Sequence, residues 1–114
     1  MAGLVCDLIG SRRIKTTLPK ARAARRMAER MVTLGKKAQA ADAPEKKLHY
    51  RRQAITKLKQ TDRVADLIDA IAPAFADRAG GYTRIVKLGT RPSDSSNMVY
   101  LEWVENIPAA ARAE

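Results

Sequence analysis

The stretch RAGGYTRIVKLGTRPSDSSNMVYLEWV, residues 78–104, determines the fold of the second half of the chain. Residues 82–88 and 98–104 are rich in β-branched and aromatic side chains, which is typical of strands. Between them, residues 89–97 are rich in Gly, Pro, Ser, Asp and Asn, which favour a loop. We therefore predict a β-hairpin. We expect regular secondary structure to be interrupted just before the hairpin, at Gly80 and Gly81. Glycine permits positive φ and close approach of the backbone to a partner.

The residues before the hairpin predict one more strand and several helices. Residues 2–9 carry apolar side chains at helical spacing, and residues 12–18 alternate apolar and basic side chains as in a half-buried strand. Pro19 suits the first turn of a helix that we expect to run to about Ala38. With two further helices, the order becomes α-β-α-α-α-β-β. This order predicts an α+β fold with a small, mixed or antiparallel three-stranded sheet and helices packed on it.

Two helices are expected between this long helix and the hairpin. Pro44 suits the start of the first, and its predicted buried face consists of Leu48, Ile55 and Leu58, joined by the stems of Arg51 or Arg52. The second begins at Thr61. We expect Pro73 to end it, because proline lacks the amide hydrogen that a helix needs.

The length and cysteine content suggest one domain in a reducing compartment. With 114 residues, the chain is long enough to form a domain with its own core. We assign this single domain to residues 1–105. We expect residues 106–114 to form a flexible tail. The single cysteine, Cys6, leaves no internal disulfide framework. No apolar run approaches bilayer length, so we expect a cytoplasmic protein without a membrane partner.

The charge is the strongest functional signal in the sequence. The net charge is +10, and the isoelectric point is about 10.3. Residues 11–60 hold sixteen Lys and Arg against three Asp and Glu, whereas residues 61–114 hold six against eight. Because so few acidic residues can pair with these basic residues, we expect the chain to bind an external polyanion. Nucleic acid is the simpler candidate, and an anionic membrane is the alternative.

Residues that could support catalysis or metal binding are sparse. His49 has no second histidine or cysteine at zinc spacing, and Cys6 lies among apolar residues. Asp62, Asp66 and Asp69 share one helix face, where a solvated acidic face explains them better than a metal site. No phosphate-binding glycine motif occurs. We therefore predict neither a catalytic site nor a cofactor.

Cations in the first predicted strand of the hairpin point to both faces of the sheet. In a strand over residues 82–88, Arg84 shares a face with Tyr82, and Lys87 lies on the other face. Such a strand suits a polyanion that wraps around it. Tyr82 either stacks on a base or packs into the core, and packing is the commoner role of a tyrosine.

Two stretches resemble a known family. IKTTLPKAR, residues 14–22, and RAGGYTRIVKLGTRPSD, residues 78–94, are similar to signature blocks of the bacterial large-ribosomal-subunit protein seventeen family. MVTLGK, residues 31–36, is similar to a helical stretch of the same family. The similarity runs in order from residue 1 to about residue 105. Members usually begin with a strongly basic arm, whereas this sequence begins at the Met of the first helix.

The resemblance implies a fold, a role and partners. It implies a two-layer α/β domain that is a structural part of the large ribosomal subunit in the cytoplasm, not an enzyme. The implied partners are ribosomal RNA and neighbouring ribosomal proteins near the peptide exit, without a small-molecule substrate. RNA recognition would rest on shape and backbone rather than on base sequence. The alternatives are a free DNA- or RNA-binding regulator and a small enzyme acting on an acidic substrate.

The predicted RNA-binding residues fall into two groups. The first group consists of basic residues before position 60, which we expect to hold phosphates: Arg12, Arg13, Lys15, Lys20, Arg22, Arg25, Arg26, Arg51 and Arg52. The second group lies in and around the hairpin: Arg78, Tyr82, Arg84, Lys87 and Arg91.

Overall fold

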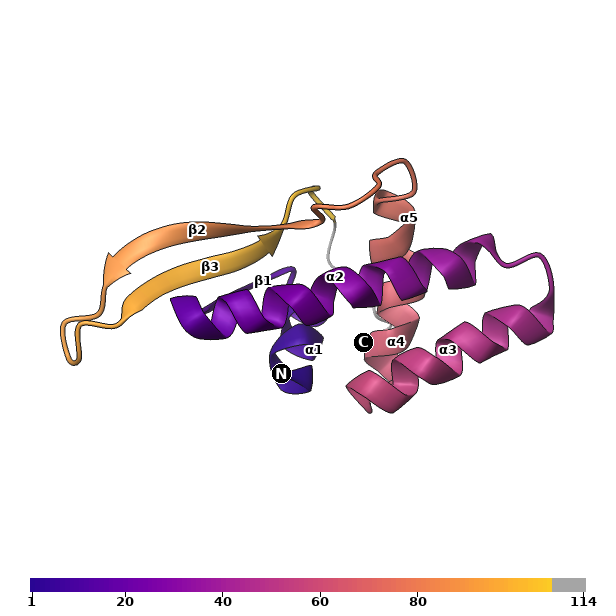
Figure 1. Ribbon diagram of the computed structural model, residues 1–114, viewed down its shortest axis with the longest axis horizontal. Coiled ribbons are helices and arrows are strands. Elements are labelled where there is room, and N and C mark those ends of the chain that lie inside the picture. Colours follow the sequence, from indigo (N-terminus) through magenta and orange to yellow (C-terminus); the bar gives the residue numbers. More distant parts are fainter. Residues whose placement is uncertain (108–114) are drawn as a thin grey trace, which may run out of the picture.

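The structure, a computed structural model, describes residues 1–107 and has the predicted α+β order (Figure 1). Its elements in chain order are α1 (Ala2–Ser11), β1 (Arg13–Thr17), α2 (Leu18–Ala40), α3 (Pro44–Leu58), α4 (Thr61–Asp66), the π-helical turn η1 (Leu67–Ile71), α5 (Ala72–Ala74), β2 (Thr83–Thr90) and β3 (Asn97–Trp103). Within residues 1–107, each helix is either too short or too polar to span a lipid bilayer.

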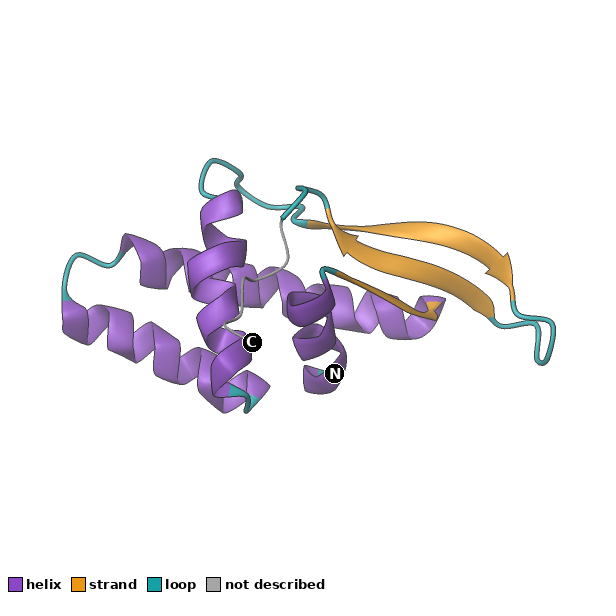
Figure 2. Cartoon of the chain, turned by 180° about the vertical axis from the view of Figure 1, so that it is seen from behind, coloured by secondary structure: helices purple, strands orange, loops and turns teal. Residues whose placement is uncertain are grey.

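The three strands form one antiparallel sheet with the order β1-β3-β2. β3 is the central strand, with Leu101 opposite Ile14 of β1 on one side and Ile85 of β2 on the other. The sequence predicts either a mixed or an antiparallel sheet, and the structure has the antiparallel one. The hairpin of β2 and β3 projects well beyond the helices, as both views show (Figures 1 and 2).

The sheet and the helices form two layers. One part of the core lies among the helices, where Leu8, Leu58 and Leu67 are buried, and the other part lies between α2 and one face of the sheet. Val99 and Leu101 are fully buried on that face. On α2, the facing positions include Ala21, Ala24 and Ala28, which are also fully buried. Small side chains at helical spacing let the helix approach the strands closely, and every second strand residue then contributes to the core.

The predicted buried face of α3 is only partly correct. Ala54 and Leu58 are buried, but the side chain of Leu48 is 45% exposed. The reason is that the buried contacts of α3 lie near its C-terminal end, where the Cys6 thiol meets the Leu58 carbonyl oxygen at 3.6 Å. Helical periodicity gave the correct face, but it does not reveal how far along a helix the neighbouring elements extend.

The expectation that Pro73 ends its helix is correct to within one residue. The helical segment continues through Pro73 to Ala74, and Phe75 directly after it is fully buried. The preceding π-helical turn shifts the hydrogen bonding, so that the Ala72 amide donates to the Leu67 carbonyl five residues back. A widened turn of this kind accommodates a proline, which lacks a donor and needs space near the preceding turn.

The predicted tail begins with a packed residue. Ile107 is 7% exposed and belongs to the hydrophobic core. The rest of that tail, residues 108–114, lies outside the described residues.

Candidate nucleic-acid interface

The four predicted RNA-binding residues of α2 lie on its exposed surface. Lys20, Arg22, Arg25 and Arg26 are all exposed. Within residues 1–107, none of the four forms an ion pair with a carboxylate. We call these four residues the α2 cations. Because no internal carboxylate neutralises them, they can contact an external anion without first breaking an internal pair.

A second set of cations lies on the sheet face opposite α2. Arg13 and Lys15 of β1 are exposed there, and the Arg13 guanidinium sits 4.0 Å from the centre of the Tyr100 ring. This cation–π contact holds the guanidinium flat on the sheet. Arg12, just before β1, adopts a left-handed conformation with φ 73° and donates a hydrogen bond to the Ile9 carbonyl. Arg12 therefore caps α1.

The hairpin cation Arg84 is engaged in an internal ion pair. Its Nη2 lies 2.6 Å from Oε2 of Glu102 on β3, and its Nε lies 2.8 Å from the same oxygen. Arg84 and Glu102 are direct partners in the antiparallel register. The pair therefore links the two strands of the hairpin across the exposed face of the sheet.

Arg91 is also engaged, at the tip of the hairpin. Its Nε and Nη2 donate to the two carboxylate oxygens of Asp94 at 2.9 and 2.6 Å. The Ser96 amide donates to Asp94 as well. The hydrogen bonds from Arg91, followed by that from Ser96, hold the pKa of the Asp94 carboxyl well below its usual range, and the same pairing raises the pKa of Arg91. The Arg91–Asp94 pair thus closes the turn.

Arg78 holds the glycine segment that enters the hairpin. Its Nε donates to the carbonyl oxygens of Gly80 and Gly81, each at 3.2 Å, and its Nη1 lies 3.9 Å from Glu105. Gly81 has φ 63°, so a positive φ is used here as predicted, although only this glycine of the pair adopts it. Three of the five residues in the second predicted group therefore have internal carboxylate partners.

Tyr82 packs into the core rather than presenting its ring to the surface. It is 4% exposed, and its ring centre lies 5.1 Å from that of Phe75. Its hydroxyl is 3.3 Å from the Lys36 ammonium, which also donates to the Arg78 carbonyl. Tyr82 is predicted either to stack on a base or to pack into the core, and it packs into the core. Its ring is therefore not available to stack on a base.

Glu29 connects α2 to the start of the hairpin, a role that the sequence analysis missed. Its carboxylate accepts hydrogen bonds from the Tyr82 amide at 3.1 Å and from the Thr83 amide and hydroxyl, both at 2.9 Å. Thr83 is 2% exposed. One signal was available, because Glu29 is the only acidic residue in α2. Its partners lie more than fifty residues away, however, and spacing along the sequence cannot identify them.

The remaining predicted cations are dispersed. Lys87 lies opposite Val99 and Arg84 opposite Glu102, so the two point to opposite faces of the sheet as predicted. Arg52 is exposed and Arg51 half-buried, both on α3. The candidates therefore cover α2, α3 and both sides of the sheet rather than one flat surface.

Other parts of the described chain lack the features of a catalytic or metal site. His49 is exposed, its Nε2 lies 2.8 Å from the side-chain nitrogen of Gln53, and its ring centre lies 5.5 Å from that of Tyr50. Cys6 is buried, and desolvation raises the pKa of its thiol, so it is a poor nucleophile. No group of three His, Cys, Asp or Glu within residues 1–107 is arranged to hold a metal ion.

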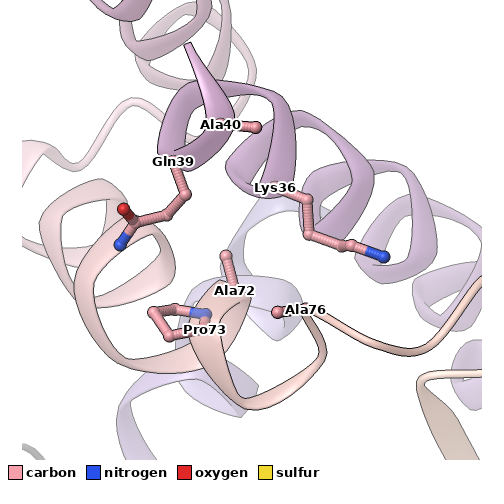
Figure 3. A pocket seen from close by; sticks show the side chains of 6 residues that line it. All are labelled: Lys36, Gln39, Ala40, Ala72, Pro73 and Ala76. Carbon is pink, nitrogen blue, oxygen red and sulfur yellow. The ribbon is translucent and has the colours of Figure 1, made fainter. Parts of the chain in front are cut away.

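An open cavity of about 370 Å³ between α2 and α5 is lined mostly by apolar side chains (Figure 3). The polar residues at its rim, Lys36 and Gln39, point apart in this view. Both are committed to internal hydrogen bonds, since the Gln39 amide nitrogen donates to the Ile68 carbonyl at 2.6 Å and Lys36 holds the Arg78 carbonyl. The cavity therefore offers few polar groups to a ligand.

Comparison with known proteins agrees with the sequence resemblance. A family described as Ribosomal protein L17 matches residues 1–104. The chain is 45% identical over 104 residues to the large ribosomal subunit protein bL17 of Agrobacterium fabrum, covering 91% of this chain and 68% of that protein. It is 44% identical to the protein of the same name from Alkaliphilus metalliredigens, with 91% and 85% covered. The corresponding protein of Rhodopseudomonas palustris is also 44% identical, with 91% and 71% covered.

Proposed function

The chain belongs to the ribosomal protein L17 family, and from this premise we propose that it binds and stabilises folded ribosomal RNA through its basic surface. As a member of this family it is a structural protein of the large subunit of the bacterial ribosome, located in the cytoplasm, and not an enzyme. The proposal concerns the part of the molecule that meets the RNA and the way in which it does so.

The α2 cations are the observation that carries the proposal. Lys20, Arg22, Arg25 and Arg26 form an exposed basic surface on a single rigid helix, without internal carboxylate partners in the described part of the chain. Each cation placed on a phosphate releases condensed counterions, which makes the interaction strong at low salt. Arg13, Lys15, Lys87, Arg51 and Arg52 extend the proposed contact around the molecule, with Arg12 next to them.

The paired arginines Arg78, Arg84 and Arg91 are proposed as RNA contacts of a different kind. A guanidinium that already holds a carboxylate keeps further N–H donors that can reach a phosphate. Its net charge is locally cancelled, however, so we expect it to position the hairpin against the RNA more than to supply affinity. Glu102, Asp94 and Glu105 would lie near the RNA in this arrangement.

Incorporation into large subunits tests the proposal. We would express a tagged chain with Arg22→Gln and Arg25→Gln and follow it through a sucrose gradient by mass spectrometry. Because two phosphate contacts would be lost, we expect a lower share of the chain in large subunits and intact ribosomes. The matched control is Lys46→Gln, an exposed lysine whose ion pair with Asp42 already cancels its charge. Equal incorporation of both variants and wild type would contradict the role of α2.

The same gradient separates the proposal from the alternative of a free nucleic-acid-binding regulator. A regulator would remain at the top of the gradient and would prefer one DNA or RNA sequence. A ribosomal role predicts that the wild-type chain sediments with large subunits and is released only when the subunits are stripped of protein.

We also propose that the chain contacts neighbouring large-subunit proteins near the peptide exit, as the family resemblance implies. Val86 and Leu88 of β2 support a protein contact, because their apolar side chains are 39% and 43% exposed on the projecting hairpin. Chemical cross-linking of intact large subunits, read by mass spectrometry, tests this part. Cross-links from the hairpin, residues 83–103, to other ribosomal proteins are expected, and their absence while cross-links form elsewhere on the chain would contradict it.

A further inference from the structure

A second cavity differs from the one in Figure 3 in that three of the side chains that line it are cations. It has a volume of about 450 Å³ and lies between α2 and the last turn of α3. Its lining consists of three cations and three apolar side chains: Arg26, Arg30, Lys57, Ala23, Met27 and Met31. A volume of this size is typical of pockets that hold a small ligand or one unit of a larger one.

The three cations come from two helices and are available to an anion. Arg26 and Arg30 are one helical turn apart on α2, and Lys57 comes from α3. All three are exposed, and within the described chain none is paired with a carboxylate. Their charge therefore favours an anionic occupant, and their separate origins favour one that reaches across the groove.

The apolar side chains favour an occupant that is more than a phosphate. Met31 is 1% exposed and belongs to the core, so the accessible apolar surface of the groove comes from the half-buried side chains of Met27 and Ala23. Thioether sulfur makes favourable contacts with aromatic rings, and a flexible methionine adapts to their shape. A phosphate alone would leave this apolar surface uncovered.

We propose that this groove receives one unstacked nucleotide of ribosomal RNA, with its base on Met27 and its phosphates on Arg26, Arg30 and Lys57. The inference rests on the proposed RNA-binding function and adds a specific site to it. Proteins recognise folded RNA largely through splayed bases in loops and bulges, which this combination of charge and apolar surface suits. An acidic protein segment with an apolar side chain is the competing occupant, and the experiment distinguishes it.

The test uses large subunits isolated from cells that express the full tagged chain. Irradiation at 254 nm joins bases to residues in direct contact, and mass spectrometry then locates the nucleotide adducts. We expect adducts on Met27 or its immediate neighbours in α2. In the Met27→Ala variant we expect the yield of these adducts to fall about 2- to 10-fold, in proportion to the lost sulfur–ring contact.

The matched control is Lys37→Gln, which removes an exposed cation of the same helix that neither lines the cavity nor belongs to the α2 cations. At equal occupancy in large subunits, it should leave the adduct yield in the groove unchanged. Occupancy also reports folding, so a variant that enters subunits normally counts as folded.

Each outcome has a distinct meaning. Adducts confined to other parts of the chain, protein cross-links in place of adducts in the groove, or no adducts at all would overturn the nucleotide site while leaving the ribosomal role intact. Absence of the wild-type chain from large subunits would instead overturn the proposed function, and the nucleotide site with it.

Discussion

The cations of α2 and those of the hairpin differ in what surrounds them. The α2 cations have no carboxylate partners in the described chain, whereas Arg78, Arg84 and Arg91 each face an acidic side chain. Charge density in the sequence explains the difference in part. Sixteen basic residues between positions 11 and 60 meet three acidic ones, while the segment with the hairpin holds slightly more acids than bases.

The comparison shows that a cation in a sequence motif is not automatically available to a ligand. The hairpin arginines shape the sheet and its turns, and their charge is largely used within the protein. The α2 cations contribute little to the fold, because the opposite face of the helix provides its packing. Four predictions test this difference, beginning with the residue that joins the two regions.

The largest expected effect comes from Glu29, which connects α2 to β2. Glu29→Ala removes a charged acceptor from three donors, including the amide and hydroxyl of buried Thr83. We expect the free energy of unfolding to fall by about 3 kcal/mol. Buried donors that lose their acceptor remain desolvated without a hydrogen bond, which destabilises the folded chain. Urea denaturation followed by circular dichroism measures the change. Glu45→Ala, at an exposed site in the first turn of α3, is the control. A loss no larger than that of the control would remove Glu29 from this role.

The next effect concerns RNA affinity and compares the two regions directly. The Arg22→Gln, Arg25→Gln double variant should lower the slope of log affinity against log salt by about 1.5, since each lost phosphate contact contributes about 0.7 to 0.9. The Arg84→Gln, Arg91→Gln variant should change the slope less, because carboxylates already offset those charges. Filter binding to large-subunit RNA over a range of salt provides both slopes. Equal reductions would mean that internal pairing does not limit RNA contact.

A smaller effect is expected from the cross-strand pair of Arg84 and Glu102. Arg84→Gln should lower the free energy of unfolding by at most about 1 kcal/mol, as is usual for an opposite-charge pair on an exposed sheet face. A double-mutant cycle with Glu102→Gln isolates the coupling between the two side chains. A coupling free energy of zero would mean that Glu102 does not stabilise Arg84. Arg84 would then be as unpaired, in energetic terms, as the α2 cations, and the proposed difference between the two regions would not hold.

The smallest effect lies at the hairpin tip and depends on pH. Pairing with Arg91 lowers the pKa of Asp94 in the folded chain below its ordinary value of 3.8. The contribution of this pair to stability is therefore complete above the ordinary pKa and is lost as the pH falls toward the lowered one. NMR titration of the Asp94 carboxyl carbon should show a midpoint below 3.8, and Arg91→Gln should move it upward. An unchanged midpoint in the variant would show that Arg91 does not hold the carboxylate.

Much of the fold could be predicted from local patterns in the sequence. The alternation in residues 12–18 and the helical stripe after Pro19 gave β1 and α2 with small errors at their ends. The errors came from context. Leu48 has the correct periodicity but lies in the N-terminal part of α3, where its side chain is 45% exposed, and the helix expected to end at Pro73 ends one residue later, at Ala74.

The sequence by itself determined the element order, the basic character of the first half and the family, because these depend on residue types and their spacing. Only the tertiary structure decided which cations are available, because availability depends on residues that are distant along the chain. It brought Glu102 opposite Arg84, turned the Tyr82 ring into the core and placed Glu29 against Thr83. It also set Lys57 beside Arg26 and Met27 to form one groove. Spacing along the sequence carries information about neighbours on one helix or strand, whereas charge pairing and burial are set by elements that meet only after folding.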